Sequence, residues 1–224
     1  MKVKGKMRLF LIGAAAVLLI AVVVIFCTLP FGTGKLGYKQ TFFYVCYDSP
    51  SDAHSASSMS SVVHSYGGAG YIIENKGKYF VTVSCYYNEN DALSVSNALN
   101  KKGLACSVLE VTAGDYELGG SAVRNKEKYL GNLNTLTSLS RLCYDLANSL
   151  DGYSLNQSGA KSVLQDVKTG LDSLARSNTA NCFSNEIESL RAECDDVSHG
   201  YVFSYDVRRL QIAIIDSVVN VKLY

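Results

Sequence analysis

The sequence has few of the residues that carry catalysis or metal binding. Its 224 residues include three histidines and no tryptophan, and they contain no Cys-x-x-Cys pair. No histidine lies three or four residues from a cysteine or from a second histidine, which is the spacing typical of metal sites. None of the histidines stands in a nucleophile or general-base motif either. The sequence therefore predicts no metal, no cofactor and no enzyme.

Prolines and an excess of one charge are also scarce. Two prolines and the absence of low-complexity runs indicate brief connections and a regular fold. Four of the 21 lysines and arginines precede residue 9, which leaves 17 basic residues against 20 acidic ones from Phe31 onward. Nucleic-acid binding depends on a basic surface, so no nucleic-acid partner is expected.

One long apolar run occupies the N-terminus. From Leu9 to Leu29 every residue is apolar or small except Cys27 and Thr28, and about 20 such residues are needed to cross a bilayer. The run predicts a single-pass transmembrane helix within residues 1–30, with the basic N-terminus cytoplasmic and the rest extracytoplasmic. A cleaved signal peptide is the alternative, although its apolar region is usually only about 7–15 residues long.

A repeat with an offset of 39 residues organises the next segment. Cys46-Tyr47 aligns with Cys85-Tyr86, and Asp52-Ala53 aligns with Asp91-Ala92, without a gap. In each copy an aromatic and β-branched run precedes a stretch with apolar residues at helical spacing, and a second β-rich run follows. The two copies predict a ferredoxin-like βαββαβ domain over residues 41–112.

The period of the apolar residues changes after residue 124. Four stretches, 129–150, 163–174, 183–197 and 207–221, carry apolar residues at spacings of three and four, which is typical of an antiparallel helical bundle. Ile212 to Val221 is β-branched enough that a strand is the alternative there. The sequence thus predicts an α+β chain in five parts: a stub and transmembrane helix at 1–30, a linker at 31–40, the ferredoxin-like domain at 41–112, a linker at 113–124 and the bundle at 125–224.

The second copy of the repeat carries a family resemblance. Val81-Thr-Val-Ser-Cys-Tyr86 is followed at regular intervals by Ala92, Leu99 and Gly103. With these residues, the segment from Thr41 to Val111 resembles the SPOR (sporulation-related) repeat domain of bacterial division and sporulation proteins. Where that family often has Gln, Ser and Arg, this chain has Phe43, Cys46 and Thr82.

The resemblance implies binding of peptidoglycan, in particular of glycan strands without stem peptides, by the open face of the sheet. The predicted function is therefore a membrane-anchored peptidoglycan-binding protein of cell division or sporulation septa. The alternative is an envelope scaffold that binds a protein partner through its helical bundle and keeps a degenerate SPOR-like domain.

Strand alternation predicts where the glycan would bind. Phe43 and Phe80 on the two central strands are expected to form one aromatic platform opposite the helices, since aromatic faces stack on sugar rings. Thr82 and Ser84 would add hydroxyl hydrogen bonds, and Cys46 stands at a position of the family motif. The alternative is that the C-terminal domain packs on this face.

Cys46 and Cys85 occupy equivalent positions of the repeat at the ends of the central strands. This placement permits a disulfide between them. The other interpretation is that both thiols are buried and pack as small apolar groups.

Overall fold

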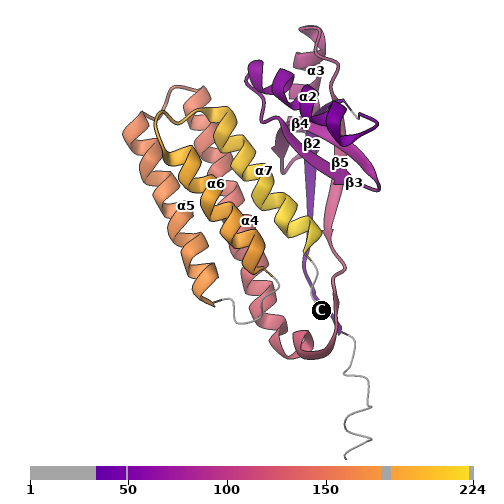
Figure 1. Cartoon of the computed structure of the whole chain (residues 1–224), viewed down its shortest axis with the longest axis vertical. Helices are drawn as coiled ribbons and strands as arrows, with labels where there is room; N and C mark the ends of the chain where they lie inside the picture. The colour runs from indigo at the N-terminus through magenta and orange to yellow at the C-terminus, as the bar shows by residue number, and fades with distance from the viewer. Residues whose placement is uncertain (1–33, 49, 178–182, 222–224) are drawn as a thin grey trace, which may run out of the picture.

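The computed structural model describes residues 34–48, 50–177 and 183–221. These residues form two sheets, six α-helices and one short 3-10 helix, with the four C-terminal helices standing beside the larger sheet (Figure 1). None of the helices in these ranges is long and apolar enough to cross a membrane. The predicted fold class, with its transmembrane helix, is corrected accordingly to an α+β fold without a spanning element in the described chain. The run predicted to span the bilayer, Leu9 to Leu29, lies outside the described residues.

The larger sheet has four antiparallel strands in the order β3-β4-β2-β5, which is the strand order of a ferredoxin-like domain. Its elements are β2 (Lys39–Asp48), α2 (Ala53–Ser65), β3 (Tyr71–Asn75), β4 (Lys78–Tyr86), α3 (Glu89–Lys101) and β5 (Ser107–Gly114). The strands of the two repeat copies therefore interleave, because β2 and β4 pair at the centre of the sheet.

Local signals in the sequence fix the ends of the two helices on this sheet. Asp52 caps α2, because its carboxylate accepts a hydrogen bond from the backbone N–H of Ser55 at 2.9 Å. Asn88 caps α3, because its side-chain oxygen accepts a hydrogen bond from the backbone N–H of Asn90 at 2.8 Å. After α2, Gly67 takes a positive φ of 81°, a conformation that glycine adopts without steric cost.

The bundle consists of four helices whose successive members run in opposite directions (Figure 1). They are α4 (Lys126–Asp151), α5 (Gln157–Ser177), α6 (Ser184–Ser198) and α7 (Ser204–Asn220). The strand alternative for the last stretch is wrong, since Ile212 to Asn220 continues α7. Six consecutive residues of α7, from Leu210 to Ile215, are buried. A helix that is buried on all sides lies between two packed layers, and here those layers are the sheet and the other bundle helices.

Short elements join the sheet to the bundle within the residues predicted as linkers. Strands β1 (Gly34–Lys35) and β6 (Glu117–Leu118) pair antiparallel, and the 3-10 helix η1 (Gly120–Asn125) leads into α4. Gly114, the last residue of β5, has a φ of 148°, and a Cβ at this position would lie 2.6 Å from the backbone oxygen of Tyr38. The glycine is therefore required by the close approach of two backbones.

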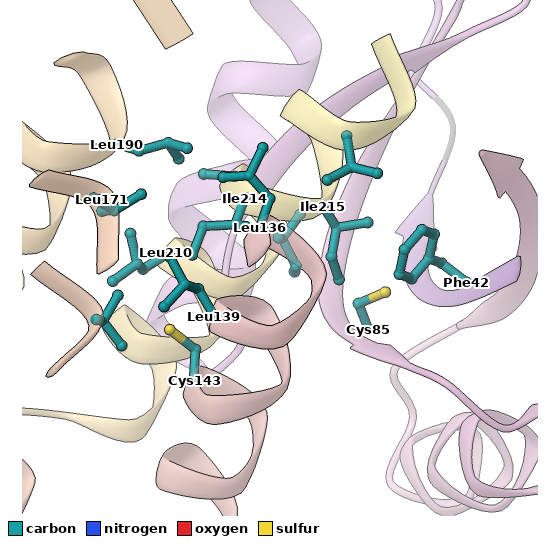
Figure 2. Packing of buried hydrophobic residues seen from close by; sticks show 14 of the residues in the cluster. Phe42, Cys85, Leu136, Leu139, Cys143, Leu171, Leu190, Leu210, Ile214 and Ile215 are labelled. Atoms are coloured by element: carbon teal, nitrogen blue, oxygen red, sulfur yellow. The ribbon is translucent and has the colours of Figure 1, made fainter. Parts of the chain in front are cut away.

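One apolar core runs through the sheet and the bundle, across the boundary between the two predicted domains. Figure 2 shows side chains that span it, from Phe42 and Cys85 on the sheet, through Leu136, Leu210, Ile214 and Ile215, to Leu171 and Leu190 on the outer helices. The sheet face opposite α2 and α3 is covered mainly by α7, which contacts β3, β4 and β5. The C-terminal helices thus pack on the face opposite α2 and α3, where glycan binding was predicted. This packing was the alternative considered from the sequence.

Polar contacts reinforce this junction. Four tyrosine side chains from the sheet side reach hydrogen-bond partners on α4 or α7. The pairs are Tyr38 with Thr137 (2.5 Å), Tyr87 with Ser140 (2.6 Å), Tyr71 with Asp216 (3.3 Å) and Tyr116 with the backbone oxygen of Val218. Buried hydrogen bonds of this kind fix how two surfaces are oriented, because leaving a buried hydroxyl unpaired is costly.

Candidate functional site

The predicted aromatic platform is not formed, because its two rings lie on opposite faces of the sheet. Phe43 packs beside Val45 on the α3 side, whereas Phe80 packs against the core shared with the bundle. The β2–β4 register shifts after Val45, where one residue of β4 is added to the ladder. An extra residue in β4 changes which face of the sheet the side chains of β4 beyond it point to. Phe80 therefore points to the face opposite that of Phe43.

The three other predicted glycan-binding residues are buried. Cys46 and Thr82 have no exposed surface, and Ser84 is 3% exposed. Thr82 uses its hydroxyl to donate to the backbone oxygen of Tyr71 at 2.8 Å. The set of Phe43, Cys46, Phe80, Thr82 and Ser84 therefore does not come together on an accessible surface.

The cysteines in the described ranges are all free and buried. Cys46 and Cys85 are therefore core thiols and do not form the disulfide considered from the sequence. Burial raises the pKa of the Cys46 thiol to about 12 and that of Cys194 to about 11. A thiol with so high a pKa is protonated at neutral pH and is a poor nucleophile.

A different surface gathers exposed aromatic side chains at one end of the bundle. Tyr153, in the α4–α5 loop, is 95% exposed, and Tyr201 and Phe203, in the α6–α7 loop, are 64% and 43% exposed. We call these three residues the aromatic surface. The ring of Phe203 lies 4.8 Å from that of Tyr201 and stacks on Tyr205 at 5.1 Å. This surface was not predicted from the sequence, although the aromatic residues directly after Gly152 and Gly200 were a signal for it.

The two loops of the aromatic surface are held together. The side-chain amide of Gln157 donates to the backbone oxygen of Val202 at 3.0 Å and accepts from its N–H at 2.7 Å. Arg208, at the start of α7, donates to Asp151 at 2.6 Å at the end of α4. Rigid loops present their side chains with little loss of conformational entropy on binding.

A groove of about 490 Å³ opens between these loops. Its lining combines the three rings of the aromatic surface with polar side chains, among them Asp151, Asn156 and Ser204. The volume falls within the range of about 300–1,000 Å³ usual for ligand sites.

A second hollow follows the seam between α6 and α7. Two adjoining cavities of about 480 and 410 Å³ share Ser189 and Glu193, so they form one groove along the seam. We call it the acidic groove, because its lining includes five carboxylates. These are Glu186, Glu193, Asp196, Asp206 and Asp216. Tyr201 lines both this groove and the groove between the loops, so the two hollows lie on either side of one side chain.

The carboxylates of the acidic groove are in an unfavourable electrostatic setting. Burial raises the pKa of Glu193, and the negative charges of the nearby Asp196 and Asp206 raise it further. Arg209, at 3.1 Å, acts in the opposite direction and lowers this pKa. Burial also raises the pKa of Asp216, and the hydrogen bond from Tyr71 partly offsets this. Part of the negative charge in the groove is therefore left uncompensated by the protein itself.

Within the part of the chain that the structure describes, no three or more His, Cys, Asp or Glu side chains are placed to hold one metal ion. No family model, no curated protein and no solved structure matches this chain. The resemblance to the SPOR domain therefore stays a prediction from the sequence.

Proposed function

We propose that this protein is a binding module that holds a protein partner on its aromatic surface. The observation that carries the proposal is the exposure of Tyr153, Tyr201 and Phe203 side by side on two clasped loops. Tyrosine and phenylalanine are enriched in protein interfaces, because they bury a large area and have few rotatable bonds. In this reading the bundle is the binding part, and the ferredoxin-like sheet is its support.

The burial of the sheet face and the exposure of the aromatic surface both support the proposal. The sheet face that would otherwise bind a ligand is buried under α7, and its residues stabilise the junction with the bundle. The aromatic surface, in contrast, contributes little to the core. Exposed aromatic side chains that do not stabilise the fold are typical of interaction sites.

The test is capture of partners by full-length protein and by a variant with Tyr153→Ser, Tyr201→Ser and Phe203→Ser. We expect the partner bound by the wild type to be lost from this triple variant, since each central aromatic anchor contributes about 2 kcal/mol or more, or roughly 30-fold in Kd. Leu93→Ser, which changes a 41% exposed residue on α3, is the matched control and should leave capture unchanged. Equal capture by wild type and triple variant would refute the proposal.

Glycan binding is a second candidate, now at a different place from the predicted one. It is favoured by the groove between the loops, where aromatic rings that stack on sugars lie beside carboxylate, amide and hydroxyl groups that hydrogen-bond to them. The test is co-sedimentation of full-length protein with glycan strands stripped of stem peptides and with intact peptidoglycan. Retention that the triple variant abolishes would support this candidate, and no retention by the wild type would end it.

A further inference from the structure

The two sides of α6 differ in how their acidic residues are neutralised. On the side facing α5, each acid meets a base: Lys168 lies 2.5 Å from Asp195, and Arg191 lies 2.6 Å from Asp172 and 2.8 Å from Glu188. On the side facing α7, the described residues give the five carboxylates of the acidic groove two basic partners: Arg209 lies 3.1 Å from Glu193, and His64 lies 3.5 Å from Asp206. The missing positive charge is therefore local to the groove.

The groove is also a place where two bundle helices leave space between them. The two cavities show that α6 and α7 do not fill the seam between them, while Leu190 and Ala213 form part of its floor. A seam with an apolar floor and acidic walls complements a chain segment that carries apolar and basic side chains together.

We propose that the acidic groove receives a basic segment of the protein partner, whose Lys or Arg side chains enter the two cavities. This rests on the proposed function, because the same segment continues past Tyr201, where its apolar side chains contact the aromatic surface. Charge complementarity sets the direction of the segment, with the basic part along α6 and α7 and the apolar part over the loops. Cations from the partner stabilise Glu193 and Asp216 in their charged forms, which burial disfavours.

The occupant can be tested without knowing the partner. The probes are two labelled peptides of about 15 residues, the length of α6, that begin with two leucines and a tyrosine. One continues with lysines and serines, and the other replaces every lysine by glutamate. Fluorescence anisotropy with full-length protein should show binding of the lysine peptide and none of the glutamate peptide.

Two matched variants locate the binding. Glu186→Gln, Glu193→Gln and Asp206→Asn together remove three charges from the acidic groove, and we expect about tenfold weaker binding of the lysine peptide, at roughly 0.5 kcal/mol per charge. The control removes three exposed charges elsewhere, by Glu89→Gln, Asp91→Asn and Glu110→Gln, and should leave the Kd unchanged. Equal weakening by both variants would overturn the proposal, because binding would then follow net charge alone.

Other outcomes separate this inference from the proposed function. Partner capture that depends on the aromatic surface but is unaffected by the groove variant would overturn the inference and leave the proposed function standing. Capture that depends on neither would overturn both. Concentration-dependent self-association that the groove variant abolishes, measured by sedimentation velocity, would identify a second copy of this chain as the occupant and would also overturn the inference.

Discussion

Since one core joins the sheet and the bundle, a cavity made at the sheet should destabilise the whole molecule. Phe42 on β2 is fully buried and points into the shared core (Figure 2). Its ring lies 5.8 Å from that of Tyr87. Phe42→Ala removes most of this side chain, and such a change in a core costs about 3–5 kcal/mol. For a chain of this size, each kcal/mol lowers the Tm by about 2–4 °C. We therefore expect a Tm lower by roughly 6–20 °C.

The assay compares two optical signals of the full-length protein during heating. Far-UV circular dichroism reports mainly the helices of the bundle, and near-UV circular dichroism reports the packed tyrosines, because the chain has no tryptophan. Both signals should fall in a single transition that Phe42→Ala shifts as a unit. Leu171→Ala, a fully buried change on α5 at the far side of the core, should shift both signals in the same way.

The result that would refute this reasoning is a loss of the near-UV signal at lower temperature while the helical signal keeps its wild-type midpoint. The sheet and the bundle would then unfold separately, and the apolar contacts of α7 with the sheet would not couple them. A calorimetric enthalpy well above the van't Hoff enthalpy would lead to the same conclusion.

Three further outcomes are expected. Gly70 has a φ of 61°, and Gly70→Ala places a Cβ 2.7 Å from the backbone oxygen of Ser60. We expect the unfolding free energy measured in urea to fall by about 2–3 kcal/mol. A fall of no more than roughly 1 kcal/mol, the cost of a left-handed backbone without a clash, would contradict this. Burial raises the pKa of Asp216, so the folded state keeps this proton to higher pH than the unfolded state, and stability is lost as the pH rises through that window. Asp216→Asn should therefore gain stability relative to the wild type as the pH rises from acid to neutral. A difference in unfolding free energy that is independent of pH would be inconsistent with this. Asp151→Ala removes a hydrogen-bond partner from the buried guanidinium of Arg208 and should lower the unfolding free energy by about 1–3 kcal/mol. In an Arg208→Met background the same change should cost much less, as a double-mutant cycle of unfolding free energies will measure. Equal costs in both backgrounds would show that the pair is not coupled.

Much of the secondary structure follows from short-range patterns. The aromatic and β-branched run that opens the second repeat copy predicts a strand, and β4 (Lys78–Tyr86) forms there. Leucines at spacings of three and four predict a helix over 129–150, and α4 (Lys126–Asp151) contains this stretch. Such patterns are reliable because they depend on the geometry of one element at a time.

The candidate site was not predictable in the same way. The sequence pointed to Phe43 and Phe80 because both fit strand alternation, but one added residue in the β4 ladder separates them. Hydrogen-bond register between strands is a property of the pair, so it cannot be read from either strand alone. The exposure of Tyr153 and Tyr201 likewise depends on which neighbours approach the loops.

The order of strands and helices, the two-copy repeat and the four apolar stripes are contained in the sequence by itself, because each depends on residues close together in the chain. The tertiary structure alone decided that α7 lies between the sheet and the bundle and that the sheet face is buried. It also decided that the exposed rings of the loops lie next to a groove lined by carboxylates of α6 and α7. These outcomes depend on contacts between residues far apart in the chain, and burial is a property of the whole packed molecule.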